Sequence, residues 1–173
     1  NTEIGDNAFE NFATISQLKF DGTGSNKNIG KRAFYGAKIT NNNNELKIPS
    51  YSSIGDYAFA GITNLQPTKL VIESNDIGES AFEGCSNIQK LELIGSLKSN
   101  GIEGNGVAQI GKRAFYNSGL NDDIEIPVSV TDIQESAFQG LQLKKITLYT
   151  NSLLETIGRR AFQGPTIKDP LKI

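Results

Sequence analysis

The segment Ile77-Gly78-Glu79-Ser80-Ala81-Phe82 is one of seven copies of an Ile-Gly-x-x-Ala-Phe motif. The other six begin and end at the pairs Ile4 and Phe9, Ile29 and Phe34, Ile54 and Phe59, Ile110 and Phe115, Ile133 and Phe138, and Ile157 and Phe162. Successive isoleucines are 25, 25, 23, 33, 23 and 24 residues apart. A repeat of this length is typical of a solenoid, in which one supersecondary unit stacks on the next.

Each position of the motif has a physical interpretation. Burying an Ile or Phe contributes about 1.5–3 kcal/mol, so every coil is expected to add a similar share to one continuous core built from the motif's first and last residues. The Gly after Ile indicates positive φ or close backbone approach. Gln134 replaces this Gly in the sixth copy, so Gly is preferred there but is not required. A Gly or Asn shortly after the Phe predicts a single helical turn with a C-cap.

A second apolar pattern follows each Phe after about nine residues. It alternates apolar-x-apolar, which predicts a short strand with one buried face. The seven triplets are centred on Lys19, Lys47, Val71, Glu92, Glu125, Thr147 and Lys172. Stacking the coils would pair these triplets into a parallel sheet. The alternation from Val128 to Ile133 suggests a second, short strand just before the Ile-Gly turn.

These patterns together resemble the BspA-type leucine-rich repeat over essentially the whole chain. The resemblance rests on Leu-x-x-Leu-x-Leu, on a Pro after the strand at Pro49 and Pro127, and on the motif with its Gly-Cys ending at Cys85. It implies an α/β leucine-rich-repeat solenoid (horseshoe), with a parallel sheet on one face and short helical turns or loops on the other. It also implies a bacterial surface or secreted protein, or a protozoan one, that binds host proteins or other cells.

Length and composition narrow the classes of function. The chain has 173 residues, with 17 Lys plus Arg against 19 Asp plus Glu, so no strong field favours nucleic acid or an anionic membrane. No apolar run reaches a membrane span and no secretory signal peptide is present. We predict one domain over residues 1–173, made of about seven coils. Since the chain starts without Met and contains none, we expect a segment of a longer array.

The side chains that point outward from the triplets form the candidate binding face, expected on the concave side. Its proposed members are Lys19, Lys47, Lys69, Val71, Lys90, Glu92, Ile94, Asp123, Glu125, Lys145, Thr147 and Tyr149. The three outward-facing columns of the triplets, taken in full, hold six lysines and six carboxylates, which favours cross-strand ion pairs in a solvated sheet over a polyanion-binding stripe. The alternative is a modest protein-binding face centred on Val71, Ile94 and Tyr149.

Three other stretches vary from coil to coil. The two residues after Ile-Gly largely alternate in sign along the stack, which predicts charge matching between coils; a basic docking site at Arg159 and Arg160 is the alternative. The polar run 41–44 reads as a surface loop. Residues 95–109 contain four glycines and lengthen one coil, which predicts an irregular loop, either tolerated or part of a binding surface.

The sequence offers little for catalysis or metal binding. Without histidine, no Ser-His or Cys-His pair and no His-ligated zinc site can form. Glu92 and Glu125 occupy the same strand position on consecutive coils, which could place two carboxylates about 5 Å apart, as in a retaining glycosidase. An open sheet, however, lacks the pocket that would raise one pKa. Asn121, Asp122 and Asp123 form too short a set for calcium. Cys85, the only cysteine, is expected to be buried and inert.

We therefore expect a non-catalytic module without a cofactor, which binds a protein partner at a cell surface or after secretion. A structural spacer that presents another domain is the alternative, and glycan binding or hydrolysis an outside possibility. An interior coil at the start and an unpaired triplet at the end also suggest end-to-end self-association.

Overall fold

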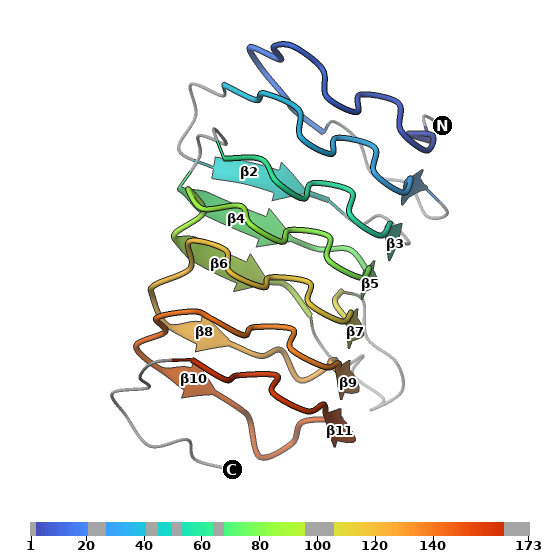
Figure 1. Cartoon of the computed structure of the whole chain (residues 1–173). Coiled ribbons are helices and arrows are strands. Elements are labelled where there is room, and N and C mark those ends of the chain that lie inside the picture. Colours follow the sequence, from blue (N-terminus) through green and yellow to red (C-terminus); the bar gives the residue numbers. More distant parts are fainter. Residues whose placement is uncertain are drawn as a thin grey trace.

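In the computed structural model, the chain forms short strands joined by turns, and successive coils stack into a β-solenoid (Figure 1). The structure describes residues 3–20, 27–40, 45–49, 53–63, 68–95 and 106–164. The last triplet, the run 41–44 and most of the loop 95–109 lie outside these ranges. None of the described segments forms a helix long and apolar enough to cross a membrane.

The apolar triplets form strands along one side of the stack, which we call the triplet face (Figure 1). Its strands are β2 (Glu45–Ile48), β4 (Lys69–Ile72), β6 (Lys90–Leu93), β8 (Ile124–Glu125) and β10 (Ile146–Thr147). All pairings are parallel, as predicted, but they form two sheets, β2-β4-β6 and β8-β10. The first triplet, at residues 18–20, is described without strand structure.

The second, short strand expected before the Ile-Gly turn is also confirmed, and it builds the longer sheet. Its strands are β1 (Asn28–Ile29), β3 (Ser53–Ile54), β5 (Asp76–Ile77), β7 (Gln109–Ile110), β9 (Asp132–Ile133) and β11 (Thr156–Ile157). They pair in parallel and in sequence order without interruption, and an isolated bridge from Ile4 to Ile29 extends the ladder by one coil. We call this six-stranded sheet the isoleucine ladder.

The segment from the Gly to the Phe of the motif is not helical, so the predicted helical turn is wrong for the described coils. Its N–H groups alternate between two kinds of acceptor. Ala81 donates back to Gly78 within the same coil, whereas Ser80 and Phe82 donate to the carbonyls of Lys112 and Ala114 in the next coil. A helix would use every N–H locally, but here half of them join neighbouring coils. Hydrogen bonds between coils therefore take the place of the local hydrogen bonds of a helical turn.

Positive φ occurs at a different motif position from the one expected. The residue before Ala has φ between 53° and 59° in all seven copies, although it is never Gly. The Gly after Ile is constrained by close approach instead. A Cβ added to Gly78 would lie 2.7 Å from the carbonyl carbon of Gly55 in the preceding coil. The residue two positions after the Phe does adopt positive φ, at Gly36, Gly61, Gly84 and Gly140 and at the variants Asn11 and Asn117.

The core runs the length of the stack between the two sets of strands. The motif phenylalanines stack nearly parallel, with ring centroids 5.0 Å apart for Phe34 and Phe59 and 5.4 Å apart for Phe82 and Phe115. Ile29, Ile54, Ile77, Ile110, Ile133 and the five inner phenylalanines are buried. The end coils differ: Phe9 and Ile157 are exposed, and Ile4 and Phe162 are half-buried. An end coil has a packed neighbour on one side only.

Candidate functional site

The triplet face brings most of the proposed binding residues into register. Lys47, Val71 and Glu92 are direct partners across β2, β4 and β6, and Thr147 pairs with Glu125 across β10 and β8. Val71 is only 5 % exposed. It therefore cannot act as the centre of an apolar contact patch. Its strand partners Lys47 and Glu92 both form ion pairs. Ile94 and Tyr149, the other two expected centres, are exposed.

Cross-strand ion pairs occupy much of this face, as the balanced charges predicted. Lys69 lies between Glu45 and Glu92, with nitrogen–oxygen distances of 3.2 and 2.7 Å. Hydrogen bonds to these carboxylates raise the pKa of Lys69. Lys47 pairs with Glu73 at 2.7 Å. The charges on strands β2, β4 and β6 are thus largely neutralised within the sheet.

A second charge cluster lies where the next coil begins. Asp122 accepts from Lys144 at 2.8 Å and contacts Lys90 at 3.1 Å. These two ammonium groups, with the N–H of Asp123, lower the pKa of Asp122 to about 2. Further along β8, the Tyr149 hydroxyl donates to Glu125 at 2.7 Å, which raises the pKa of Tyr149. From the sequence, Asp122 was considered only as a calcium ligand. Nothing in the pattern indicated that it pairs with both Lys144 and Lys90.

The triplet face is interrupted between β6 and β8, and we call this interruption the seam. The N–H of Asn121 still donates to the carbonyl of Gln89 at 3.1 Å, just before both strands begin. Beyond that point β6 and β8 share no backbone bond in the described part of the chain. No pattern in the sequence predicted this break directly, although the 33-residue spacing falls in the same coil.

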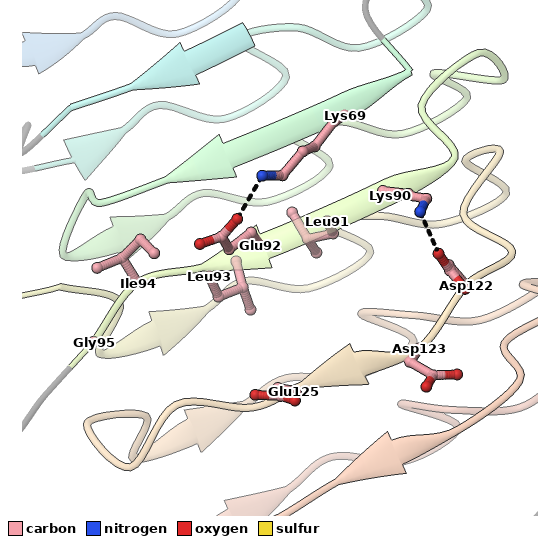
Figure 2. A pocket seen from close by; sticks show the side chains of 10 residues that line it. All are labelled: Lys69, Lys90, Leu91, Glu92, Leu93, Ile94, Gly95, Asp122, Asp123 and Glu125. Atoms are coloured by element: carbon pink, nitrogen blue, oxygen red, sulfur yellow. Dashed lines mark ion pairs between the residues drawn. The ribbon is translucent and has the colours of Figure 1, made fainter. Parts of the chain in front are cut away.

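A depression of about 510 Å³ lies over the seam (Figure 2). Its lining combines two lysines, four carboxylates and an apolar floor: Lys69, Lys90, Leu91, Glu92, Leu93, Ile94, Gly95, Asp122, Asp123 and Glu125. Six of these are proposed binding-face residues, on β4, β6 and β8 or directly beside β6 and β8: Lys69, Lys90, Glu92, Ile94, Asp123 and Glu125. Leu91 and Leu93 belong to the buried core, although each keeps 8 % exposure where the matching Leu70 and Ile72 have none.

The remaining face residues lie outside this depression. Lys19 is exposed in the first coil, and Lys47 belongs to β2. Lys145 is exposed just before β10, and Thr147 is half-buried within it. The site that the structure assembles is therefore narrower than the predicted face, and it is centred on the fourth and fifth coils.

The alternative chemistries gain no support from the geometry. Glu92 and Glu125 belong to strands that do not pair, and each has another partner, Lys69 and Tyr149. Among the described residues, no group of three or more His, Cys, Asp or Glu side chains could hold a metal ion. Cys85 is buried, donates to the Phe59 carbonyl at 3.0 Å, and has its pKa raised to about 12 by burial.

Oppositely charged side chains of neighbouring coils do pair. Most of these pairs, however, include a residue other than the two that follow Ile-Gly in the motif. Arg113 forms a two-bonded pair with Glu83 and lies 4.0 Å above the Tyr116 ring. Arg32 repeats this arrangement with Glu10 and Tyr35. Among the ion pairs of the described residues, only that of Lys112 with Glu135, at 4.0 Å, joins two of the predicted positions. Asp6 and Asp56 instead accept from the backbone N–H groups of Lys31 and Glu79 in the next coil. Arg159 and Arg160 are exposed and have no ion pair within the described ranges.

Comparison with known proteins supports the repeat assignment. The family model described as "BspA type Leucine rich repeat region" matches in six copies, over residues 1–105 and 108–170. No curated protein matches. No solved structure matches either. The repeat period, the stacked strands and the family match agree, and the chain therefore belongs to the BspA-type leucine-rich repeat family.

Proposed function

We propose that this chain is a non-catalytic protein-binding module of a cell-surface or secreted protein, and that it binds its partner through the triplet face. The observation that carries the proposal is the depression over the seam, where charged side chains surround the exposed Ile94 and two leucines, Leu91 and Leu93, that are 8 % exposed. Protein interfaces use such mixed surfaces, with an apolar centre and a polar rim. Repeat families of this kind serve as interaction or structural modules, which supports the same conclusion.

The test compares two variants with matched changes in charge. The face variant carries Lys47→Ser, Glu92→Ser and Glu125→Ser. The control carries Lys31→Ser, Glu3→Ser and Glu155→Ser, which are exposed residues on the side of the isoleucine ladder. Both lose one positive and two negative charges. Immobilised chains are exposed to a panel of extracellular matrix proteins and to intact cells, and bound protein is measured by surface plasmon resonance.

Binding by the wild type and the control, with loss of binding in the face variant, supports the proposal. Equal binding by all three chains contradicts the use of the triplet face. A glycan array run with the same three chains separates protein recognition from sugar recognition.

A structural spacer is the second candidate, because the ion pairs of Lys69, Lys47 and Asp122 leave much of the triplet face internally neutralised. Such a face needs no partner. The spacer function predicts that the face variant adheres like the wild type, whereas deletion of whole coils shortens the reach of an attached domain.

Self-association is a separate proposal, since Phe9, Phe12, Leu153 and Ile157 are exposed on the two end coils of the described stack. A further coil, from a second copy or from the same protein, would bury them. Sedimentation velocity of the wild type and of Phe12→Asp over a range of concentrations tests whether copies associate. Identical, concentration-independent sedimentation contradicts the proposal.

A further inference from the structure

The seam leaves backbone hydrogen-bonding groups open on its β6 side. Lys90 and Ile94 donate to Thr68 and Ile72, so the even-numbered residues of β6 are directed toward β4. Because successive residues of a strand direct their backbone groups to opposite edges, Leu91 and Leu93 are directed toward β8. Their N–H and carbonyl groups have no backbone partner among the described residues. Polar groups in such a position require water or a ligand.

The β8 side adds negative charge. Ile124 and Ile126 donate to Lys145 and Thr147 in the next coil, so the backbone groups of Asp123 and Glu125 are directed toward the seam. Both residues also line the depression. Asp123 is exposed and forms no ion pair with any described residue. Glu125 accepts only the neutral Tyr149 hydroxyl. Figure 2 shows both carboxylates on the β8 side of the depression, opposite Glu92 on β6.

The lysines of the depression do not balance this charge. Lys69 is held by Glu45 and Glu92, and Lys90 is held by Asp122. Four carboxylates and two lysines line the depression, so it carries a net negative charge, in contrast to the nearly balanced remainder of the face. The complementary ligand group is therefore cationic.

The apolar floor defines the ligand further. The exposed Ile94 can contact a hydrocarbon stem. The open carbonyls and the carboxylates together offer several acceptors to a ligand that has more than one donor. The arginine side chain combines an apolar stem with a planar guanidinium that carries five N–H donors. A lysine ammonium is a compact, strongly hydrated point charge and matches this arrangement less well.

We propose that the seam binds an arginine side chain presented by a protein partner, and this inference rests on the proposed function. The guanidinium donates to the open carbonyls of Leu91 and Leu93 and to the carboxylates of Asp123 and Glu125. Its methylene stem lies against Ile94. The triplet face thereby recognises basic segments of a partner at the break between β6 and β8.

The probe is a capped pentapeptide, acetyl-Gly-Ser-Arg-Ser-Gly-amide, titrated into the ¹⁵N-labelled chain. Matched peptides carry lysine or citrulline in place of arginine; citrulline keeps the shape but has no charge. We expect saturable amide shifts concentrated at Leu91, Leu93, Asp123 and Glu125 with the arginine peptide, weaker shifts with lysine, and none with citrulline. No saturable shift with arginine, or equal binding by lysine, overturns the inference.

Two variants locate the site. The double variant Asp123→Asn and Glu125→Gln should lower the affinity for the arginine peptide by about tenfold or more, because charge-assisted hydrogen bonds are lost. The control, Glu45→Gln and Glu73→Gln, removes two carboxylates from the same face outside the depression and should bind as the wild type does. If both variants lose the same affinity for the peptide, the peptide responds only to the general charge of the face, and this overturns the inference.

The two proposals fail in different ways. If protein capture depends on the triplet face while the arginine peptide gives no saturable shift, the proposed function stands and the arginine site is overturned. If the peptide binds at the seam but no captured protein depends on the face, the proposed function falls, and with it the assignment of the arginine to a protein partner.

Discussion

Both sides of the coils are built from short strands, of two to four residues on the triplet face and of two residues in the isoleucine ladder, yet only the ladder is continuous. The isoleucine ladder runs through β1, β3, β5, β7, β9 and β11 without a break, whereas the triplet face divides between β6 and β8. Both sides cross the same junction between the fourth and fifth coils. There Gly111 donates to Ile77 at 2.7 Å on the ladder side, while Leu91 and Leu93 have no backbone partner on the triplet side among the described residues.

The difference shows where a solenoid of this kind tolerates irregular length. The six residues of the motif are bonded to the neighbouring coil at every second N–H and are packed through Gly and Phe, so their register cannot slip. The long 33-residue spacing enters after the triplet and before the next isoleucine. Its effect appears on the triplet face, and also in the widest phenylalanine spacing, 5.4 Å between Phe82 and Phe115.

Amide hydrogen exchange should show the largest contrast between the two sides. The Gly111 N–H should exchange only through large-scale unfolding, because it lies within the ladder. Leu91 and Leu93 should exchange at least about a thousandfold faster, since opening a local site costs far less than the roughly 5–15 kcal/mol of global unfolding. Ile94, on the same strand but bonded to Ile72, serves as the protected control. Equal protection at all these sites would mean that β6 and β8 pair in solution.

The phenylalanine stack should show the next largest effect. Phe82→Ala removes a ring buried between Phe59 and Phe115 and should lower the free energy of unfolding by about 3–5 kcal/mol. Phe9→Ala removes the equivalent ring from an end coil, where Phe9 is 38 % exposed. It should lower the free energy of unfolding by at most about 2 kcal/mol. Urea unfolding monitored by circular dichroism measures both. Equal losses would mean that the end coil is as well packed as the interior.

Substitution of two glycines separates close approach from backbone conformation. Gly78→Ala places a Cβ against the backbone of the preceding coil and should cost about 1–3 kcal/mol through overpacking. Gly84→Ala meets nothing within 4 Å but occupies a position with φ of 70°, which should cost about 1–2 kcal/mol. Thermal unfolding distinguishes them. A neutral Gly78→Ala would contradict the close approach of coils on the ladder side.

The smallest effect concerns the acid stability of the triplet face. The ion pairs that lower the pKa of Asp122 from 3.8 to about 2 stabilise the folded state above about pH 4, and this contribution disappears as the pH falls toward 2. Asp122→Asn should therefore lower the stability at pH 7 by less than about 1 kcal/mol and leave it unchanged near pH 2. Asp123→Asn, without an ion pair, is the matched control. A pH-independent loss in Asp122→Asn would exclude the ion pairs as its cause.

Much of the architecture followed from the sequence because its repeat is strict. The period of Ile77 and its six counterparts predicted stacked coils, and the alternation around Val71 and Glu92 predicted parallel strands. The helical turn was wrong because local propensity cannot reveal that the N–H of Phe82 bonds to the next coil. Val71 was placed correctly on the outer side of its strand, yet its burial depends on the long side chains of neighbouring coils.

The sequence by itself determined the apolar spine, because residues that recur at a fixed period must occupy equivalent positions in every coil. It also determined the balance of charge, which disfavours a polyanion-binding face. Only the tertiary structure decided where the sheet breaks and which carboxylates are left over. Those features depend on distances between residues of different coils, and a pattern within one coil contains no information about them.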